Sequence, residues 1–449
     1  MVAPLRTLAV VAAAIAGGAL VLAVLALALS SGAFVANEDK HPAVNTEPPL
    51  RPKPPKGAKP LHELRQQTVA TWQKRLQEEP ENPRAWAELG QAYMSLARAN
   101  GERNLYADAE PALRRALELS AAPDSFTRRA LATCLLLQLR LKEAADFIDQ
   151  SARLLPKDGA FFALQGDLFL AEGRYEEAAK QFARYEKIEG GSHASARLAH
   201  LEMLHGNWVR ARELLQACTG EPVIDPESPA WLCVQLGLID LNTGNLQSAR
   251  QLFGEALQWA PQWPYALLPL ARCEELLGDL SAARGYLNEA HKVSRTAEVM
   301  LPLARVEGAL GNANRAALLH NEALRLLQVR LTMDDKAALR PFALALLHAG
   351  AKPEAALEYA AQDVALREDI YSCAVLAWAR SANGLHKEAL EALARALRLN
   401  TRDATLWLAA ERVYRAAGEG AKADEALKRA HEINPFTKGR EAQWLAGWR

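Results

Sequence analysis

The sequence is poor in cysteine and has no excess of charge of either sign. Five cysteines in 449 residues, with no CxxC spacing, exclude a disulfide-built scaffold, and only Cys218 and Cys233, which flank a predicted loop, could form a single bridge. The 53 Lys and Arg residues balance 53 Asp and Glu residues, which excludes a strongly basic nucleic-acid binder. We therefore expect no nucleic-acid partner, and any charged binding surface has to be local.

Motifs of the familiar enzyme classes are also missing. The chain contains no GxGxxG, GxxxxGK[ST], GxSxG, SxxK or HExxH pattern, which removes the common hydrolases and nucleotide-binding folds. His193, His200 and His205 are close in sequence, but on one helix His200 and His205 would point about 140° apart, and only His193 and His200 could share a face. We predict a protein that is not an enzyme and that has no catalytic, metal or cofactor site.

One apolar run stands near the N-terminus. Residues 8–29 carry no charge and, at about 1.5 Å per residue, are long enough to cross a bilayer. Residues 1–36 are predicted to be a transmembrane anchor, although the small residues Ser31 and Ala33 would also suit cleavage of a signal peptide. Because Arg6 precedes the run and few basic residues follow it closely, we expect a single-pass membrane protein with its remainder outside the cytoplasm.

A proline-rich segment follows the apolar run. Residues 37–60 contain seven prolines and almost no bulky apolar side chain, which favours an extended polyproline-II spacer. The alternatives left open are a docking peptide at residues 52–56 or contact of its lysines with anionic lipid. Residues 61–82 are predicted to form an unpaired helix before the main domain.

An internal repeat occupies most of the chain. An alanine register mark returns every 33 to 39 residues, and a small residue usually stands twelve positions before it, as at Gly166 and Gly237. Between these marks a glycine supplies a turn, so each repeat is predicted to be two antiparallel helices. The register marks are Ala109, Ala144, Ala178, Ala211, Ala249, Ala283, Ala316, Ala355, Ala389 and Ala423.

This pattern resembles the tetratricopeptide-repeat family. The opening of the family's motif, Trp-x-x-Leu-Gly-x-x-Tyr, is present from Trp86 to Tyr93. The resemblance implies an all-α, right-handed α-solenoid of about ten repeats over residues 83–435, with the first helix of each repeat lining a long concave groove. Residues 436–449, with Trp444 and Trp448 one helical turn apart, are predicted to cap its end; membrane or partner contact is the alternative. The Ala, Leu and Arg bias suggests a bacterial source.

The predicted function is that of a noncatalytic scaffold, tethered to a membrane through residues 8–29, which binds a partner protein or peptide in its groove. Aromatic and arginine side chains are the usual anchors of interfaces, and arginines would suit an acidic partner. A secreted or peripheral carrier of a small ligand or metal is the alternative. The residues expected to line the groove are Trp231, Tyr265, Arg272, Arg305, Arg340, Tyr371, Trp378, Arg412 and Arg415.

Charged residues show a second regularity. Acidic residues occupy one equivalent position in the first helices of repeats four to seven, and in the first three of these repeats an arginine follows ten residues later. Antiparallel geometry would place acid and arginine at one height, which suggests a ladder of ion pairs within hairpins, although independently solvated charges are as good an interpretation. The predicted pairs are Glu202 with Arg212, Asp240 with Arg250, and Glu274 with Arg284.

Overall fold

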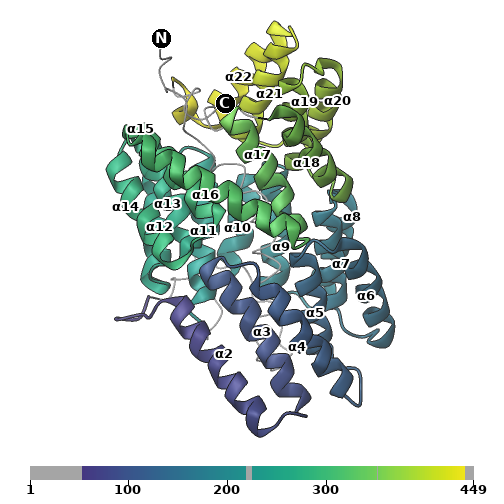
Figure 1. Ribbon diagram of the computed structural model, residues 1–449. Helices are drawn as coiled ribbons and strands as arrows, with labels where there is room; N and C mark the ends of the chain where they lie inside the picture. The colour runs from purple at the N-terminus through teal and green to yellow at the C-terminus, as the bar shows by residue number, and fades with distance from the viewer. Residues whose placement is uncertain (1–52, 219–224, 351, 440–449) are drawn as a thin grey trace.

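The computed structural model describes residues 53–218, 225–350 and 352–439, and all regular structure in these ranges is helical (Figure 1). No helix in the described ranges is long and apolar enough to span a bilayer, and the predicted anchor at residues 8–29 lies outside them. The predicted cap with Trp444 and Trp448 also lies outside them.

The helices are α2 (Leu61–Glu78), α3 (Pro83–Asn100), α4 (Leu105–Leu119), α5 (Ser125–Leu137), α6 (Leu141–Leu154), α7 (Ala160–Ala171), α8 (Tyr175–Ile188), α9 (Gly191–Leu204), α10 (Trp208–Ala217), α11 (Glu227–Asn242), α12 (Leu246–Trp259), α13 (Pro264–Leu277), α14 (Leu280–Val293), α15 (Ala297–Ala309), α16 (Ala313–Thr332), α17 (Leu339–Ala349), α18 (Pro353–Leu366), α19 (Ile370–Ala382), α20 (His386–Ala396), α21 (Ala404–Ala416) and α22 (Gly420–Ile433), with short 3-10 helices η2 (Lys336–Ala338) and η3 (Pro435–Thr437).

From α3 onward the helices form ten antiparallel pairs, which we number as repeats one (α3 and α4) to ten (α21 and α22). The helix α2 packs against α3 and has no earlier partner among the described residues. Within most pairs a glycine in the left-handed conformation ends the first helix, as Gly278 does after α13 with φ of 92°. In repeat two Leu139 takes this conformation instead, with φ of 57°. The predicted all-α solenoid of about ten helix pairs is confirmed.

The two helices of a repeat approach closely because the first carries a small residue opposite a large one. A Cβ atom added to Gly166 in α7 would lie 2.4 Å from the ring of Phe182 in α8, and one added to Gly237 would lie 2.6 Å from Phe253. Both phenylalanines are fully buried. The small residue that the sequence places twelve positions before each alanine therefore provides the room for the second helix.

The first helices form the inner layer of the solenoid. In repeat five, α11 buries 13 of its 16 residues, whereas α12 buries 6 of 14. First helices of neighbouring repeats also contact one another, as α17 contacts α19 and α19 contacts α21. A curved stack has its shorter arc on the inside, so these contacts place the first helices on the concave side.

The solenoid returns onto itself. The turn of repeat three lies against the segment that follows repeat eight, where the Glu368 amide donates to the carbonyl of Glu172 at 3.2 Å, and Arg398 donates to the carbonyl of Gly173 at 2.9 Å. The turn inside each such repeat thus meets the end of the repeat five places further along the chain. One superhelical turn therefore takes about five and a half repeats. We call this contact between successive turns the seam. The same offset pairs Gly101 with Ser294, Gly206 with Arg402, and Gly244 with Asn434.

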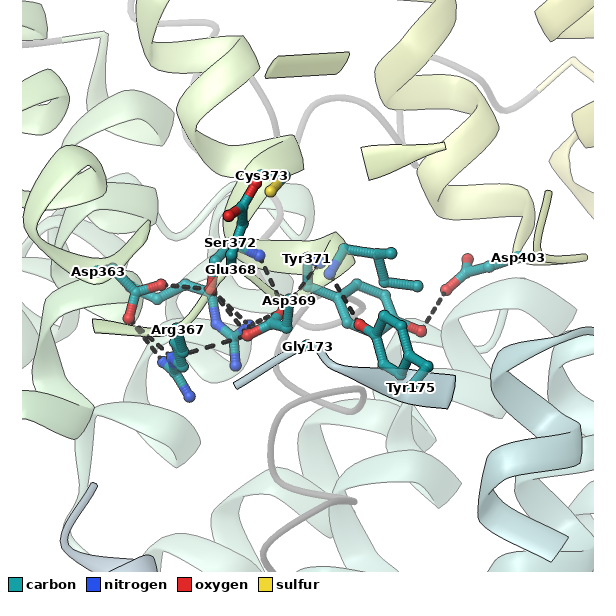
Figure 2. A network of polar contacts seen from close by, with 12 residues as sticks. Gly173, Tyr175, Asp363, Arg367, Glu368, Asp369, Tyr371, Ser372, Cys373 and Asp403 are labelled. Atoms are coloured by element: carbon teal, nitrogen blue, oxygen red, sulfur yellow. Dashed lines mark hydrogen bonds and ion pairs between the residues drawn. The ribbon is translucent and has the colours of Figure 1, made fainter. Parts of the chain in front are cut away.

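A polar network holds the middle of the seam (Figure 2). The amide of Ile370, at the start of α19, donates to the hydroxyl of Tyr175 in α8 at 3.0 Å. Next to it Tyr371 donates its hydroxyl to Asp403 at 3.2 Å, and Arg340 pairs with Asp369 at 3.0 Å. Asp369 in turn accepts from the first backbone amides of α19 and caps that helix. Capping, inter-repeat packing and seam contact therefore depend on the same short segment.

At the N-terminal end a buried carboxylate closes the seam. Glu227, only 1% exposed at the start of α11, pairs with Arg98 of α3 at 2.8 Å and with Arg65 of α2 at 3.0 Å. Arg65 also pairs with Asp225 at 2.6 Å. Burial by itself would raise the pKa of Glu227, but the guanidinium groups of Arg98 and Arg65 outweigh it and hold that pKa below its usual range. These ion pairs thus hold helices α2 and α3 against repeat five.

The ion-pair ladder lies one helix away from its predicted place. None of the three predicted pairs within hairpins is formed within 4 Å between these described residues; Arg212 instead pairs with Asp240 of the next repeat at 2.5 Å, and Arg250 with Glu274 at 2.8 Å. Within its own hairpin Asp240 accepts from Ser248, eight residues later, at 2.6 Å. On the second helix, the residues eight and ten positions after the acidic residue point about 200° apart. The residue ten positions after it therefore faces the next repeat.

Replacing Glu227 by Gln should open the N-terminal part of the seam. The substitution removes the carboxylate that pairs with Arg98, whose side chain is 7% exposed, while Arg65 keeps its pair with Asp225. Breaking a buried pair in this way typically costs about 3 kcal/mol. Hydrogen exchange followed by mass spectrometry should show faster exchange in α2, α3 and α11. The matched control is Glu213→Gln, which breaks the exposed pair with Arg210; equal exchange in both variants would show that Glu227 does not hold the seam.

Candidate functional site

One position of the repeat places a side chain on the inner layer in every repeat. It directly follows the small residue of the first helix, or the residue in its place, and we call this set the inner row. Nine of its ten members are buried, and Arg412 is half-buried. The inner row consists of Gln91, Thr133, Asp167, His200, Leu238, Arg272, Arg305, Leu344, Trp378 and Arg412.

The inner row changes character along the solenoid. Asp167 is paired with Arg197 through contacts of 2.8 to 3.0 Å. Other polar members are buried without a hydrogen-bond partner: the hydroxyl of Thr133, both ring nitrogens of His200, and the Nε and Nη1 atoms of Arg305. Buried polar atoms are nearly always paired in folded proteins, so repeated exceptions at one register position mark an interior suited to water or a ligand.

The groove residues predicted from sequence fall into separate places. Arg272, Arg305, Trp378 and Arg412 belong to the inner row. The others lie elsewhere: Trp231 is buried in α11, Tyr265 accepts from Gln235 at 3.0 Å, Arg340 and Tyr371 belong to the seam network, and Arg415 is 53% exposed and pairs with Glu411 and Asp424. That these nine residues bind a partner stays a prediction.

Sequence reasoning missed the polar members of repeats two and four, Thr133 and His200. The signal was available, because both directly follow the small residue that marks each repeat. It also missed His348 in α17, whose ring lies 5.1 Å from that of Trp378. No repeat register marks His348, and only the stacking of α17 on α19 brings the two rings together.

Positive charge collects around His348. The guanidinium of Arg412 lies over the ring of Trp378 at 5.4 Å, and Arg305 and Arg272 share the carboxylate of Glu275. Burial above all, and then the neighbouring His320, Arg305 and Arg412, hold the pKa of His348 well below its ordinary value.

No metal centre is visible in the described part of the chain. No group of three or more His, Cys, Asp or Glu side chains is arranged there to hold a metal ion. His205 is exposed and contacts the carbonyl of Leu201, whereas His200 is buried in the inner row. No disulfide bond joins any of the five cysteines, all of which lie in the described residues, so the bridge between Cys218 and Cys233 is not formed. Burial raises the pKa of the Cys134 thiol to about 12.

Comparison with known families agrees with this geometry. Residues 241–299, from the end of α11 to the start of α15, match the family model described as tetratricopeptide repeat. This segment is similar to a tetratricopeptide repeat. Such repeats generally bind proteins or peptides, and their fold is typically noncatalytic. A search of curated protein sequences finds no match.

Several solved structures are similar to this chain in fold. They include PilW, titled a widely conserved type IV pilus biogenesis factor, with 19% identity, a TM-score of 0.37, and coverage of 43% of this chain and 90% of that one. Pseudomonas aeruginosa pilF has 16% identity, a TM-score of 0.37, and coverage of 44% and 88%. A human IFIT1 dimer with m7Gppp-AAAA has 18% identity, a TM-score of 0.44, and coverage of 75% and 77%.

The buried His200 should make this protein sensitive to acid. Burial lowers the pKa of His200 from 6.5 to about 4, so between these values the unfolded chain binds a proton that the folded chain does not. Stability should therefore fall as pH drops from about 6.5 to 4, by about 3 kcal/mol from this residue. Denaturant unfolding of His200→Leu should show a shallower pH dependence, while the exposed control His205→Gln should behave like the parent; identical slopes in all three proteins would refute this assignment.

Proposed function

We propose that this protein is a noncatalytic scaffold that binds a segment of a partner protein along its inner row. The observation that carries the proposal is the repeated occurrence, at one register position, of buried polar atoms without partners. A solenoid that needed only to fold could place apolar side chains there, as it does at Leu238 and Leu344. Polar side chains held at that position are available to a bound chain.

The charge of the inner row favours an acidic partner segment. From repeat six onward the row contains Arg272, Arg305 and Arg412, and the carboxylate of Glu275 serves both Arg272 and Arg305. Arginine binds carboxylates with paired hydrogen bonds, and Trp378 adds an apolar face beside Arg412. Since the chain as a whole carries no net charge, this attraction is confined to one part of the interior.

Reversing one charge of the inner row should abolish partner capture. In chemical cross-linking of the full chain in its native cells, Arg305→Glu should lose the partner that the parent recovers, because the acidic segment then meets a like charge. The matched control, Arg325→Glu, makes the same change at an exposed outer site on α16.

Folding is checked separately, since Arg305 is buried. Circular dichroism and thermal unfolding should show retained helicity, and Arg412→Glu, at a half-buried position, should give the same loss of partner. Unchanged recovery by both inner variants would rule out the inner row as the binding surface.

We further propose that the scaffold is tethered to a membrane, with its repeats outside the cytoplasm. The support is the uncharged run of residues 8–29, the basic Arg6 before it, and the proline-rich segment that would hold the repeats away from the bilayer. Neither the run nor most of the segment lies within the described residues.

Protease treatment of intact and lysed cells tests the tether and its orientation. We expect digestion of residues 37–60 without rupture of the inner membrane, with residues 1–36 still attached to the mature protein. Sequencing of the N-terminus from the same sample distinguishes an anchor from a cleaved signal peptide. Protection of the repeats until the inner membrane is broken would place them in the cytoplasm and refute the proposed orientation.

A further inference from the structure

The longest helix of the described residues carries apolar side chains on its exposed side. Helix α16 has 20 residues, whereas the second helices of the other repeats have 10 to 15. Leu318 of α16 is 68% exposed, Val329 is 42% exposed, and Met333, which directly follows the helix, is 71% exposed. No other helix in the described ranges has more than one exposed large apolar side chain. Figure 1 shows α16 in the foreground, on the outside of the solenoid.

The exposed stripe of α16 has the spacing of a helix-pairing seam. Between its two apolar residues stand Glu322 and Arg325, which pair at 2.7 Å and have side chains that are 40% and 60% exposed. At about 100° per residue, these four side chains fall within about 60° around the helix. Their spacing of four, three and four residues is that of the seam of a two-stranded coiled coil. A second helix is therefore the element that this stripe fits.

The C-terminal part of the stripe is held in place by contacts within the chain. Arg330 pairs with Glu298 of α15 at 2.7 Å and with Asp335, beyond the helix, at 2.8 Å. On the inner side Leu327 is fully buried. The extra length of α16 is thus already ordered, so a partner helix would meet a preformed surface and lose less entropy on binding.

We propose that α16 of one molecule packs antiparallel against α16 of a second copy of this chain. The order of residues along the stripe is apolar, acidic, basic, apolar, and each apolar residue stands four positions from the charge beside it. In one antiparallel register Leu318 therefore faces Val329 of the second copy. The same register sets Glu322 against Arg325 of that copy, and a two-fold axis repeats both contacts.

Charge selects both this partner and this direction. A parallel arrangement would set Glu322 against Glu322 and Arg325 against Arg325, and like charges repel. In the antiparallel arrangement each charge of the stripe meets its opposite, so the stripe is complementary to itself. The apolar contacts supply the attraction, while the ion pairs specify direction and register. A lipid surface suits the stripe less, because a helix that lies on a membrane keeps its charges on the face away from the lipid.

Cysteine cross-linking of the full chain in its native cells tests the pairing. Two differently tagged copies are expressed together, one with Leu318→Cys and the other with Val329→Cys, and mild oxidation should join them. Leu318→Cys alone should not join to itself, because its two copies would lie about 16 Å apart along the helices. The matched control combines Val329→Cys with Ile188→Cys on α8, where Ile188 is 54% exposed. Equal yields from the mixed pair and this control, or no mixed product, would overturn the interface.

Sedimentation of the purified full chain in detergent measures the dimer directly. Glu322→Arg should weaken association about tenfold, because the seam then carries only positive charge, and adding Arg325→Glu should restore it. Both side chains are solvent-exposed, so folding should not change. A parent that stays monomeric, or a double variant as weak as Glu322→Arg, would contradict the proposal. Arg325→Glu alone should weaken the dimer and leave partner recovery unchanged, so this interface and the inner row can fail separately.

Discussion

The close approach of the two helices in each repeat is the constraint on which the rest of the structure depends. Phe182 fits over Gly166, and Phe253 over Gly237, because neither glycine has a Cβ atom. This contact sets the shape of each hairpin, and a hairpin of that shape exposes an apolar face that only the next hairpin can cover. The curvature, the inner layer of first helices and the position of the inner row all follow from repeating one unit.

Curvature alone does not close a solenoid, and here the chain adds contacts between successive turns. Tyr175 meets Ile370, Asn434 donates to the carbonyl of Leu241 at 3.0 Å, and Glu227 joins Arg65 and Arg98. These contacts link residues about 130 to 195 positions apart, so they add non-local stability to an architecture that otherwise relies on neighbouring repeats.

The interior has two kinds of position. At the seam, buried charges are matched by specific partners, as Arg340 is by Asp369. In the inner row, Thr133, His200 and Arg305 keep buried polar atoms without partners. Both kinds of burial are costly, but only the second leaves donors and acceptors for something that is not part of the chain. That difference is the physical basis for proposing a binding surface inside the solenoid.

The sequence by itself determined the repeat, its two helices and its small-residue contact, because each depends on residues at most 40 positions apart and recurs along the chain. It could also have identified the inner row, which follows that register. The seam, the partners of Arg340 and Glu227, and the exchange of ladder pairs between repeats were decided only by the tertiary structure. The seam depends on how a small rotation between neighbouring repeats accumulates over five and a half repeats. The ladder pairs depend on which side of the second helix the arginine faces, ten residues after the acidic residue.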